Sequence, residues 1–160
     1  SWVLTEMPDN DVIEAFLTAY GHDIDDGALE GWLDYFTDDG IYQIITRENF
    51  EAGLPMGIMY CQGRGMMSDR IQAMGSANIF EDHTYCHILG PAQVSESGKG
   101  EYQARTNFTV FRTMQDGRTE TYVVGKYLDR ITMRGDGPFF VERRVVLESR
   151  RVDILLVRPL

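Results

Sequence analysis

Residues 101–134 read EYQARTNFTVFRTMQDGRTETYVVGKYLDRITMR, and this stretch decides the fold. It holds two long runs rich in β-branched and aromatic residues, 101–112 and 119–134, separated by the turn signal MQDGR. A third such run, 138–157, follows a second turn signal, RGDGP, and a fourth, 84–97, precedes them all. The pattern predicts three long strands of an antiparallel meander, with a fourth strand before them.

The run 119–134 would reach roughly 50 Å as one extended strand. A strand of that length fits a small domain only if the sheet twists and bends strongly. Gly125 lies in the middle of the run, where we expect a bulge or a kink.

The N-terminal third has helical periodicity. In residues 9–20, apolar side chains recur at the i, i+3, i+4, i+7 spacing of an amphipathic helix: Ile13, Phe16, Leu17 and Tyr20. The same spacing over 29–36 predicts a second helix, which TDDG then stops. We expect a first strand over Ile41 to Arg47 and a further helix over residues 64–74.

Helices followed by a long, curved, antiparallel sheet predict the α+β class: a sheet folded around the N-terminal helices as a cone. The chain has 160 residues, of which 43% are hydrophobic, so we expect one domain, 1–160, with a sizeable core. There is no internal repeat, linker or low-complexity segment.

Charge and hydropathy exclude several classes of protein. The formal net charge of −10 argues against binding to nucleic acid, which requires a basic face. No apolar run approaches the roughly 20 residues of a membrane helix, and the N-terminus lacks the features of a secretory signal. Two cysteines in a domain of this size are typical of free thiols in a reducing compartment, so we expect a cytoplasmic protein.

The stretch EDHTYCHILG, residues 81–90, has the composition of a metal site. However, β-forming residues lie between His83 and His87, and on a strand two residues four apart are about 13 Å apart, too far to share an ion. A Rieske cluster needs two Cys-His pairs, and only Cys86-His87 is present. We therefore expect both histidines to form hydrogen bonds at the start of a strand or at an interface.

Two further groups of residues have alternative interpretations. His83 could form an acid–base pair inside the cone with one of four residues: Asp82, Asp34, Tyr35 or Tyr42. Four arginines, Arg143, Arg144, Arg150 and Arg151, form either a solvated face or ion pairs with a neighbouring subunit. The apolar C-terminus VDILLVRPL must be buried, in the core or against another chain.

Residues 104–131 together with the segment FFVERRVVLESRRVDILLVRPL resemble the C-terminal half of the small (beta) subunit of Rieske-type aromatic ring-hydroxylating dioxygenases. Segments in the order expected for that family extend the resemblance over nearly the whole chain: WLDYFTDDGIYQI, RENFEAGLP, MSDRIQAM and YCHILGPAQV. RENFEAGLP and VDILLVRPL are most similar to the small subunits of salicylate hydroxylases and terephthalate dioxygenase. The chain differs from the family pattern at Cys86, where an arginine is frequent.

The resemblance implies a cystatin-like or NTF2-like cone and a non-catalytic role in the catabolism of aromatic compounds, with an aromatic carboxylic acid as substrate. It also implies that the Rieske [2Fe–2S] cluster and the mononuclear iron lie on a separate large (alpha) subunit, and none on this chain. The small subunits would form a trimer within a three-plus-three hexamer, with His83, His87 and the four arginines as interface candidates. The alternatives are a stand-alone dehydratase or isomerase of the same fold, or a module that binds a small ligand in the cone.

Overall fold

The computed structural model describes residues 8–55, 57–77, 83–148 and 159–160. Its helices are α1 (Asp9–Asp25), the 3-10 helix η1 (Leu29–Tyr35), α2 (Arg47–Glu51) and α3 (Arg64–Ala77). Its strands are β1 (Phe36–Thr46), β2 (Met59–Gln62), β3 (His83–Leu89), β4 (Gln93–Gly98), β5 (Glu101–Met114), β6 (Thr119–Arg134) and β7 (Gly137–Leu147).

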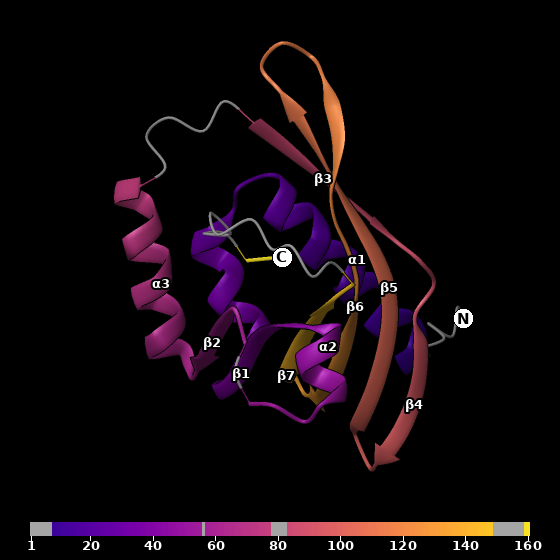
Figure 1. The fold of residues 1–160 in the computed structure, drawn as a ribbon. Coiled ribbons are helices and arrows are strands. Elements are labelled where there is room, and N and C mark those ends of the chain that lie inside the picture. Colours follow the sequence, from indigo (N-terminus) through magenta and orange to yellow (C-terminus); the bar gives the residue numbers. More distant parts are fainter. Residues whose placement is uncertain (1–7, 56, 78–82, 149–158) are drawn as a thin grey trace, which may run out of the picture.

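All seven strands belong to one sheet, with the order β2-β1-β7-β6-β5-β3, and β4 also pairs with β5. The pairing of β1 with β7 is parallel, and the other pairings are antiparallel. The long strands β5 and β6 curve around α1, which lies on the concave side of the sheet (Figure 1). The predicted α+β fold, with a strongly curved and mainly antiparallel sheet around an N-terminal helix, is confirmed.

Helix α1 buries the apolar stripe predicted from the sequence. Ile13, Leu17 and Tyr20 are at most 2% exposed, because their spacing places them on the face that covers the sheet. The helix continues beyond the predicted end to Asp25, and Gly27 then adopts a positive φ of 75°. A glycine in this conformation just after a helix is a common way to end it.

The segment after α1 differs from the prediction. Residues 29–35 form a 3-10 helix, and Phe36 already pairs with Phe140 of β7. The TDDG segment, which we expected to end a helix, instead lies inside β1, where the register shifts between Phe36 and Ile41. An irregularity in the strand thus accommodates polar residues whose local preference is for a turn.

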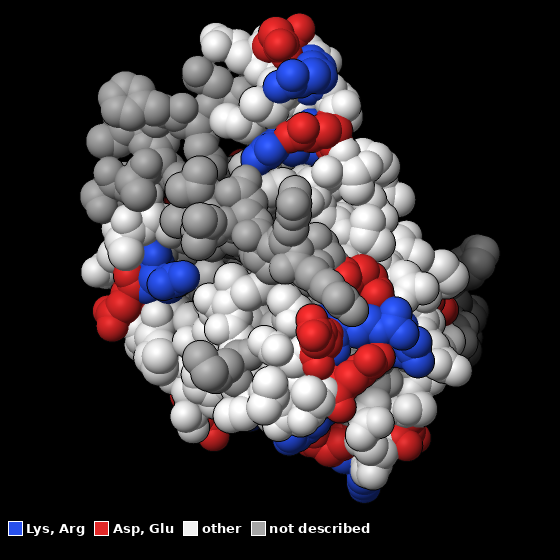
Figure 2. All heavy atoms as spheres, in the orientation of Figure 1, with Lys and Arg blue, Asp and Glu red and all other residues white. Residues whose placement is uncertain are grey.

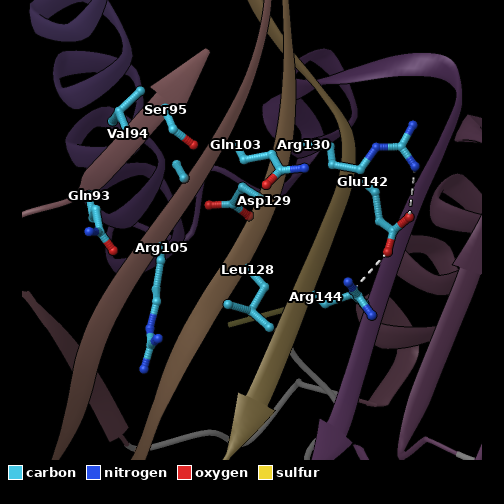
Figure 3. A pocket seen from close by; sticks show the side chains of 11 residues that line it. Gln93, Val94, Ser95, Gln103, Arg105, Leu128, Asp129, Arg130, Glu142 and Arg144 are labelled. Carbon is cyan, nitrogen blue, oxygen red and sulfur yellow. Dashed lines mark ion pairs between the residues drawn. The ribbon is translucent and has the colours of Figure 1, made fainter. Parts of the chain in front are cut away.

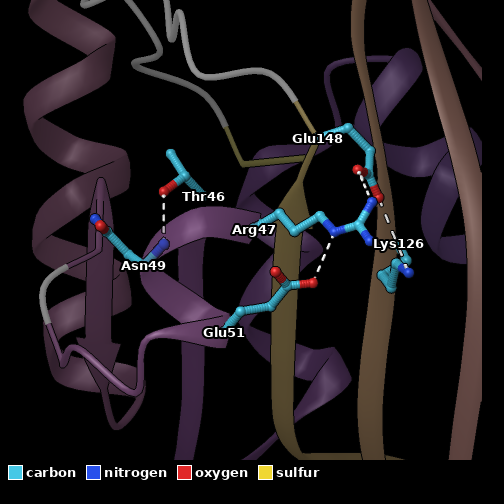
Figure 4. Close-up of polar contacts among 6 residues, drawn as sticks. All are labelled: Thr46, Arg47, Asn49, Glu51, Lys126 and Glu148. Atoms are coloured by element: carbon cyan, nitrogen blue, oxygen red, sulfur yellow. Dashed lines mark hydrogen bonds and ion pairs between the residues drawn. The ribbon is translucent and has the colours of Figure 1, made fainter.

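The end of β1 also differs from the prediction, which extended this strand to Arg47. Arg47 begins the short helix α2, and the side chain of Thr46 caps this helix by accepting a hydrogen bond from the backbone N–H of Asn49 (Figure 4). Helix α2 and strand β2 were not predicted. The predicted helix over residues 64–74 is confirmed as α3.

The predicted strand over residues 84–97 is two strands, β3 and β4, which pair with different parts of β5. The strand is interrupted at Gly90-Pro91, between β3 and β4. The backbone N–H of Gly90 donates to the carbonyl of Asn107 over 2.8 Å. β7 is described to Leu147; the predicted continuation to residue 157 falls mostly in 149–158, outside the described residues.

Gly125 of β6 lies against the backbone of β7. A Cβ atom at this position would overlap the carbonyl oxygen of Val146 and lie 3.1 Å from the ring of Phe108. The pairing with β5 is continuous through Gly125, and the nearest register shift lies between Val110 and Phe111 of β5. The glycine is therefore required for close packing. Of the two predicted alternatives at this residue, the bulge is wrong, and the kink stays a prediction.

Candidate functional site

The inner face of the sheet carries the polar groups that a cone-shaped enzyme would use, and the first of these is a histidine–carboxylate pair. Asp25, the last residue of α1, approaches His87 of β3: its Oδ1 lies 2.6 Å from His87 Nδ1, and its Oδ2 accepts the His87 backbone N–H over 2.8 Å. The His87 side chain is 2% exposed, and its ring stacks on Phe108. Two bonds from one carboxylate fix the end of α1 to β3.

This pair was missed from the sequence, which suggested His83 as the histidine of an acid–base pair. Within the described residues, no hydrogen bond joins His83 to Asp34, Tyr35 or Tyr42, and Asp82 lies outside them. Instead, Tyr35 donates its hydroxyl to Asp23. Both histidines do lie on one strand, β3, as predicted. Nothing in the sequence connects Asp25 with His87, which are 62 positions apart.

A buried ion pair lies further along the inner face. Arg143 of β7 is directly opposite Asp129 of β6, and the Arg143 Nε lies 3.5 Å from Asp129 Oδ1. The guanidinium carbon lies 3.4 Å from the ring centroid of Tyr127 and 4.2 Å from that of Tyr20, within the range of cation–π attraction. Arg143 is 0% exposed, so the interpretation of the arginine run as a solvated face is wrong for this residue.

Several polar atoms around this ion pair are buried without a hydrogen-bond partner in the described part of the chain. They are Tyr127 Oη, Thr106 Oγ1, both carboxylate oxygens of Asp129, and Nε and Nη1 of Arg143. Burial raises the pKa of Asp129 from 3.8 to about 7, although the charge of Arg143 acts in the opposite direction. Burial likewise raises the pKa of Tyr127. The inner face therefore disfavours the charged form of Asp129 near neutral pH.

The C-terminal leucine closes another part of this interior. Leu160 is 3% exposed, and its backbone N–H donates to the Tyr42 hydroxyl over 2.7 Å. Its carbonyl oxygen accepts the Tyr20 hydroxyl over 3.0 Å, and Trp32 Nε1 donates to that same hydroxyl. The predicted burial of the C-terminus is confirmed for residues 159–160. The Tyr42 hydroxyl, which we considered as a partner of His83, is hydrogen-bonded to the backbone of Leu160.

The outer face of the sheet carries a groove of about 540 Å³ across β4, β5, β6 and β7 (Figure 3). Glu142 lies between two arginines of this groove: its Oε1 is 2.8 Å from Arg144 Nε, and its Oε2 is 3.6 Å from Arg130 Nη1. Arg144 also packs over the ring of Phe50 in α2. The side chains that line the groove include Gln93, Ser95, Gln103, Arg105, Leu128, Arg130, Glu142 and Arg144.

Ion pairs also connect α2 to the sheet. Arg47 pairs with Glu51 over 2.8 Å and with Glu148 over 2.9 Å, and Lys126 approaches Glu148 (Figure 4). In Figure 2, basic and acidic side chains lie next to one another in patches on the face shown. Exposed ion pairs of this kind contribute little to the free energy of unfolding, so their main effect is on the orientation of α2 relative to the sheet.

Neither a metal centre nor a membrane helix is evident in the described ranges. No group of three or more His, Cys, Asp or Glu side chains there could hold a metal ion. Of the two cysteines, both of which are free, Cys61 is buried, and this burial raises the pKa of its thiol. No helix among the described residues is long and apolar enough to cross a membrane.

Comparison with known proteins identifies relatives over most of the chain. A family model described as the ring hydroxylating beta subunit matches residues 22–153. The anthranilate 1,2-dioxygenase small subunit of Burkholderia cepacia is 36% identical, over 88% of this chain and 86% of that protein. The terephthalate 1,2-dioxygenase terminal oxygenase component subunit beta 1 of Comamonas sp is 38% identical, over 92% of this chain and 96% of that protein.

Solved structures agree with these relatives. A beta subunit assigned to an aromatic-ring-hydroxylating dioxygenase of Novosphingobium aromaticivorans superposes with a TM-score of 0.87 at 36% identity, covering 94% of this chain and 96% of that chain. An NTF2-like protein with a cystatin-like fold from the same organism gives a TM-score of 0.68 at 22% identity, covering 93% and 88%. The second likeness concerns the fold alone and confirms the predicted NTF2-like, cystatin-like cone.

Proposed function

The chain belongs to the ring hydroxylating beta subunit family, and from this membership we propose that it is the non-catalytic assembly subunit of a multicomponent aromatic ring-hydroxylating dioxygenase in aromatic catabolism. The observation that carries the proposal is the near-complete coverage, at 36–38% identity, of small subunits of the anthranilate and terephthalate dioxygenases. The enzyme is an oxidoreductase, and this chain contributes structure to it.

The contacts of the inner face support a structural role. His87 and Asp25 use both carboxylate oxygens to join α1 to β3. The guanidinium of Arg143 packs against aromatic rings. The backbone N–H of Leu160 donates a hydrogen bond to the Tyr42 hydroxyl, and its carbonyl oxygen accepts one from the Tyr20 hydroxyl. Asp25, Tyr20 and Tyr42, which a stand-alone dehydratase or isomerase could direct at a substrate, are thus bonded to elements of the fold.

The described residues do not fit either iron centre of such an enzyme. A Rieske cluster needs two cysteines and two histidines, and a mononuclear iron needs converging histidines and a carboxylate. Here Cys61 is buried in β2, and His83 and His87 are four positions apart on β3. We therefore propose that the Rieske [2Fe–2S] cluster and the mononuclear iron lie on a large (alpha) subunit, and we derive no reaction step on this chain.

The assembly that we propose is three small and three large subunits, with the small subunits as a cytoplasmic trimer that supports the large ones. A trimer closed by three-fold symmetry repeats one heterologous contact, in which two different surfaces of the same chain meet. Anthranilate and terephthalate are both aromatic carboxylic acids, which supports this class of substrate for the complete enzyme. Arg150 and Arg151 stay interface candidates, and both lie outside the described residues.

Co-expression with a large subunit of the same dioxygenase class tests this proposal. We expect the two chains to co-purify through a tag on either one, and we expect all the iron and the visible absorbance to remain with the large subunit when the chains are separated. The small chain purified alone should be colourless. Failure of the chains to co-purify, or stoichiometric iron on the small chain, would contradict the proposal.

A further inference from the structure

The outer groove is basic, although the chain as a whole has a net charge of −10. It is lined by three arginines, Arg105, Arg130 and Arg144, and by Glu142. We call these four residues and their surroundings the basic groove. Glu142 is shared between Arg144 and Arg130, and within the described residues Arg105 makes no ion pair. Three arginines against one glutamate leave the groove a net charge of +2.

One further carboxyl borders the basic groove without neutralising it. Asp129 is 3% exposed and lies opposite the buried Arg143, whose Nε is 3.5 Å from Asp129 Oδ1. Burial raises the pKa of Asp129 to about 7, which favours its neutral form. The charge that a ligand in the groove would meet is therefore that of the three arginines and Glu142.

The register of the strands sorts the side chains of the basic groove into two rows that cross the sheet. The first row takes one residue from each of β4, β5, β6 and β7, and each lies directly opposite the next: Gln93, Arg105, Leu128 and Arg144. The second row is built in the same way: Ser95, Gln103, Arg130 and Glu142. Figure 3 shows Arg105, Leu128 and Arg144 in this order across the groove.

The first row places two guanidinium groups on either side of one apolar side chain. Neighbouring strands are about 4.8 Å apart, so the α-carbons of Arg105 and Arg144 are roughly 10 Å apart, with Leu128 between them. A guanidinium binds a carboxylate through two parallel hydrogen bonds. An apolar ring over Leu128 would thus have an arginine at each of two opposite ends.

The surroundings of the first row also suit a small ligand. The groove has a volume of about 540 Å³, which is within the range of small-molecule sites. Arg144 is already held by Glu142 and by the ring of Phe50, so it loses little conformational freedom when a ligand binds. Gln103 and Arg130 of the second row add hydrogen-bond donors beside the ring.

We propose that the basic groove binds a rigid aromatic dicarboxylate, with its ring on Leu128 and one carboxylate on each of Arg105 and Arg144. The two negative charges of such a ligand match the net charge of the groove. This inference goes beyond the proposed function, because it gives the small chain a ligand of its own at a site that needs no large subunit.

Isothermal titration calorimetry of the full-length chain tests the inference with three probes. Terephthalate has one carboxylate at each end of a benzene ring, benzoate has the ring with one carboxylate, and adipate is a flexible dicarboxylate without a ring. We expect terephthalate to bind about tenfold or more tighter than either of the others. Equal affinities for the three probes, or tighter binding of inorganic phosphate, would overturn the inference.

Substitution of the two arginines tests their assignment. Arg105→Gln and Arg144→Gln should each weaken terephthalate binding about tenfold or more and remove the preference for terephthalate over benzoate. Arg105 is exposed and makes no ion pair in the described part of the chain, so its variant should fold normally, which circular dichroism checks. Unchanged terephthalate affinity in Arg105→Gln would overturn the inference.

A matched control removes two cations elsewhere. Lys99→Gln/Arg118→Gln changes exposed residues in the β4–β5 and β5–β6 turns and should leave terephthalate binding unchanged. An equal loss of affinity in this control would show that net charge alone attracts the ligand, and would overturn the inference.

The same titration on the complex with a large subunit separates this inference from the proposed function. Complexes with wild-type and Arg105→Gln small chains should differ by one terephthalate site per small subunit. No difference between them would show that the groove is covered in the assembly, which would overturn the inference and leave the proposed function intact. Failure of the two chains to co-purify would instead contradict the proposed function, and the titration of the small chain would still decide whether the groove binds its ligand.

Discussion

The buried carboxyl of Asp129 makes the stability of this subunit depend on pH in an unusual direction. Its pKa is about 7 in the folded chain, whereas an aspartate in the unfolded chain has the ordinary value of 3.8. Between these two pH values the folded state holds a proton that the unfolded state has released. The free energy of unfolding therefore falls as pH rises through this window, the opposite of the behaviour of a salt-bridged surface carboxylate.

The magnitude follows from the two pKa values. The stabilisation that this carboxyl provides is fully present below pH 3.8 and is lost progressively until the pH exceeds about 7. Between pH 5.5 and pH 7.5 the loss amounts to on the order of 2 kcal/mol. Asp129→Asn cannot titrate and has nearly the same shape, so we expect the wild type to lose about 2 kcal/mol relative to this variant over that range.

Urea denaturation followed by far-ultraviolet circular dichroism at pH 5.5, 6.5 and 7.5 measures this difference. Asp26→Asn, which removes one exposed carboxylate at the end of α1, controls for the loss of a negative charge in general. A difference between wild type and Asp129→Asn that stays constant over this pH range would refute the reasoning, because the buried carboxyl would then titrate alike in both states.

Three further predictions concern stability in urea. Gly125→Ala should destabilise the chain by about 1–3 kcal/mol because the new methyl group meets the backbone of β7, whereas Gly135→Ala, which has open space around it, should have little effect; equal effects would contradict the close packing. Asp25→Ala and His87→Ala should each cost about 1–3 kcal/mol, and the double variant little more than one of them; simple additivity would show that the pair is not coupled. Tyr42→Phe removes the hydroxyl that bonds the buried C-terminal leucine and should cost about 1–2 kcal/mol; a neutral effect would contradict that bond.

The parts of the fold that were predicted correctly have local periodicities. The apolar stripe of α1 and the long runs of β5 and β6 could be recognised because their patterns repeat over three or more turns or pairs of residues. The start of β1 could not, since its TDDG segment has the local preferences of a turn and is held in the strand by pairing with the distant β7. Helix α2 and β2 are only five and four residues long, which is too short for a periodic signal.

The interior polar contacts illustrate a second limit. Arg143 and Arg144 are adjacent in the sequence, and their alternation along β7 places one in the core and the other in the outer groove. The residue two positions after each arginine is apolar, Val145 for Arg143 and Val146 for Arg144, so the alternation in the sequence did not show which arginine was buried. The partners Asp25 and Asp129 come from other elements, and only the folded sheet brings them to His87 and Arg143.

The most direct test of the central claim is the turnover of the assembled dioxygenase with His87→Gln in the small subunit. This histidine and Asp25 form the pair at hydrogen-bond distance on the inner face that most resembles an acid–base site. We predict that the complex containing the variant keeps the wild-type mass and the wild-type rate per iron centre, even if it unfolds at lower urea. A complex of unchanged mass and iron content that loses turnover would contradict a purely structural role for this chain.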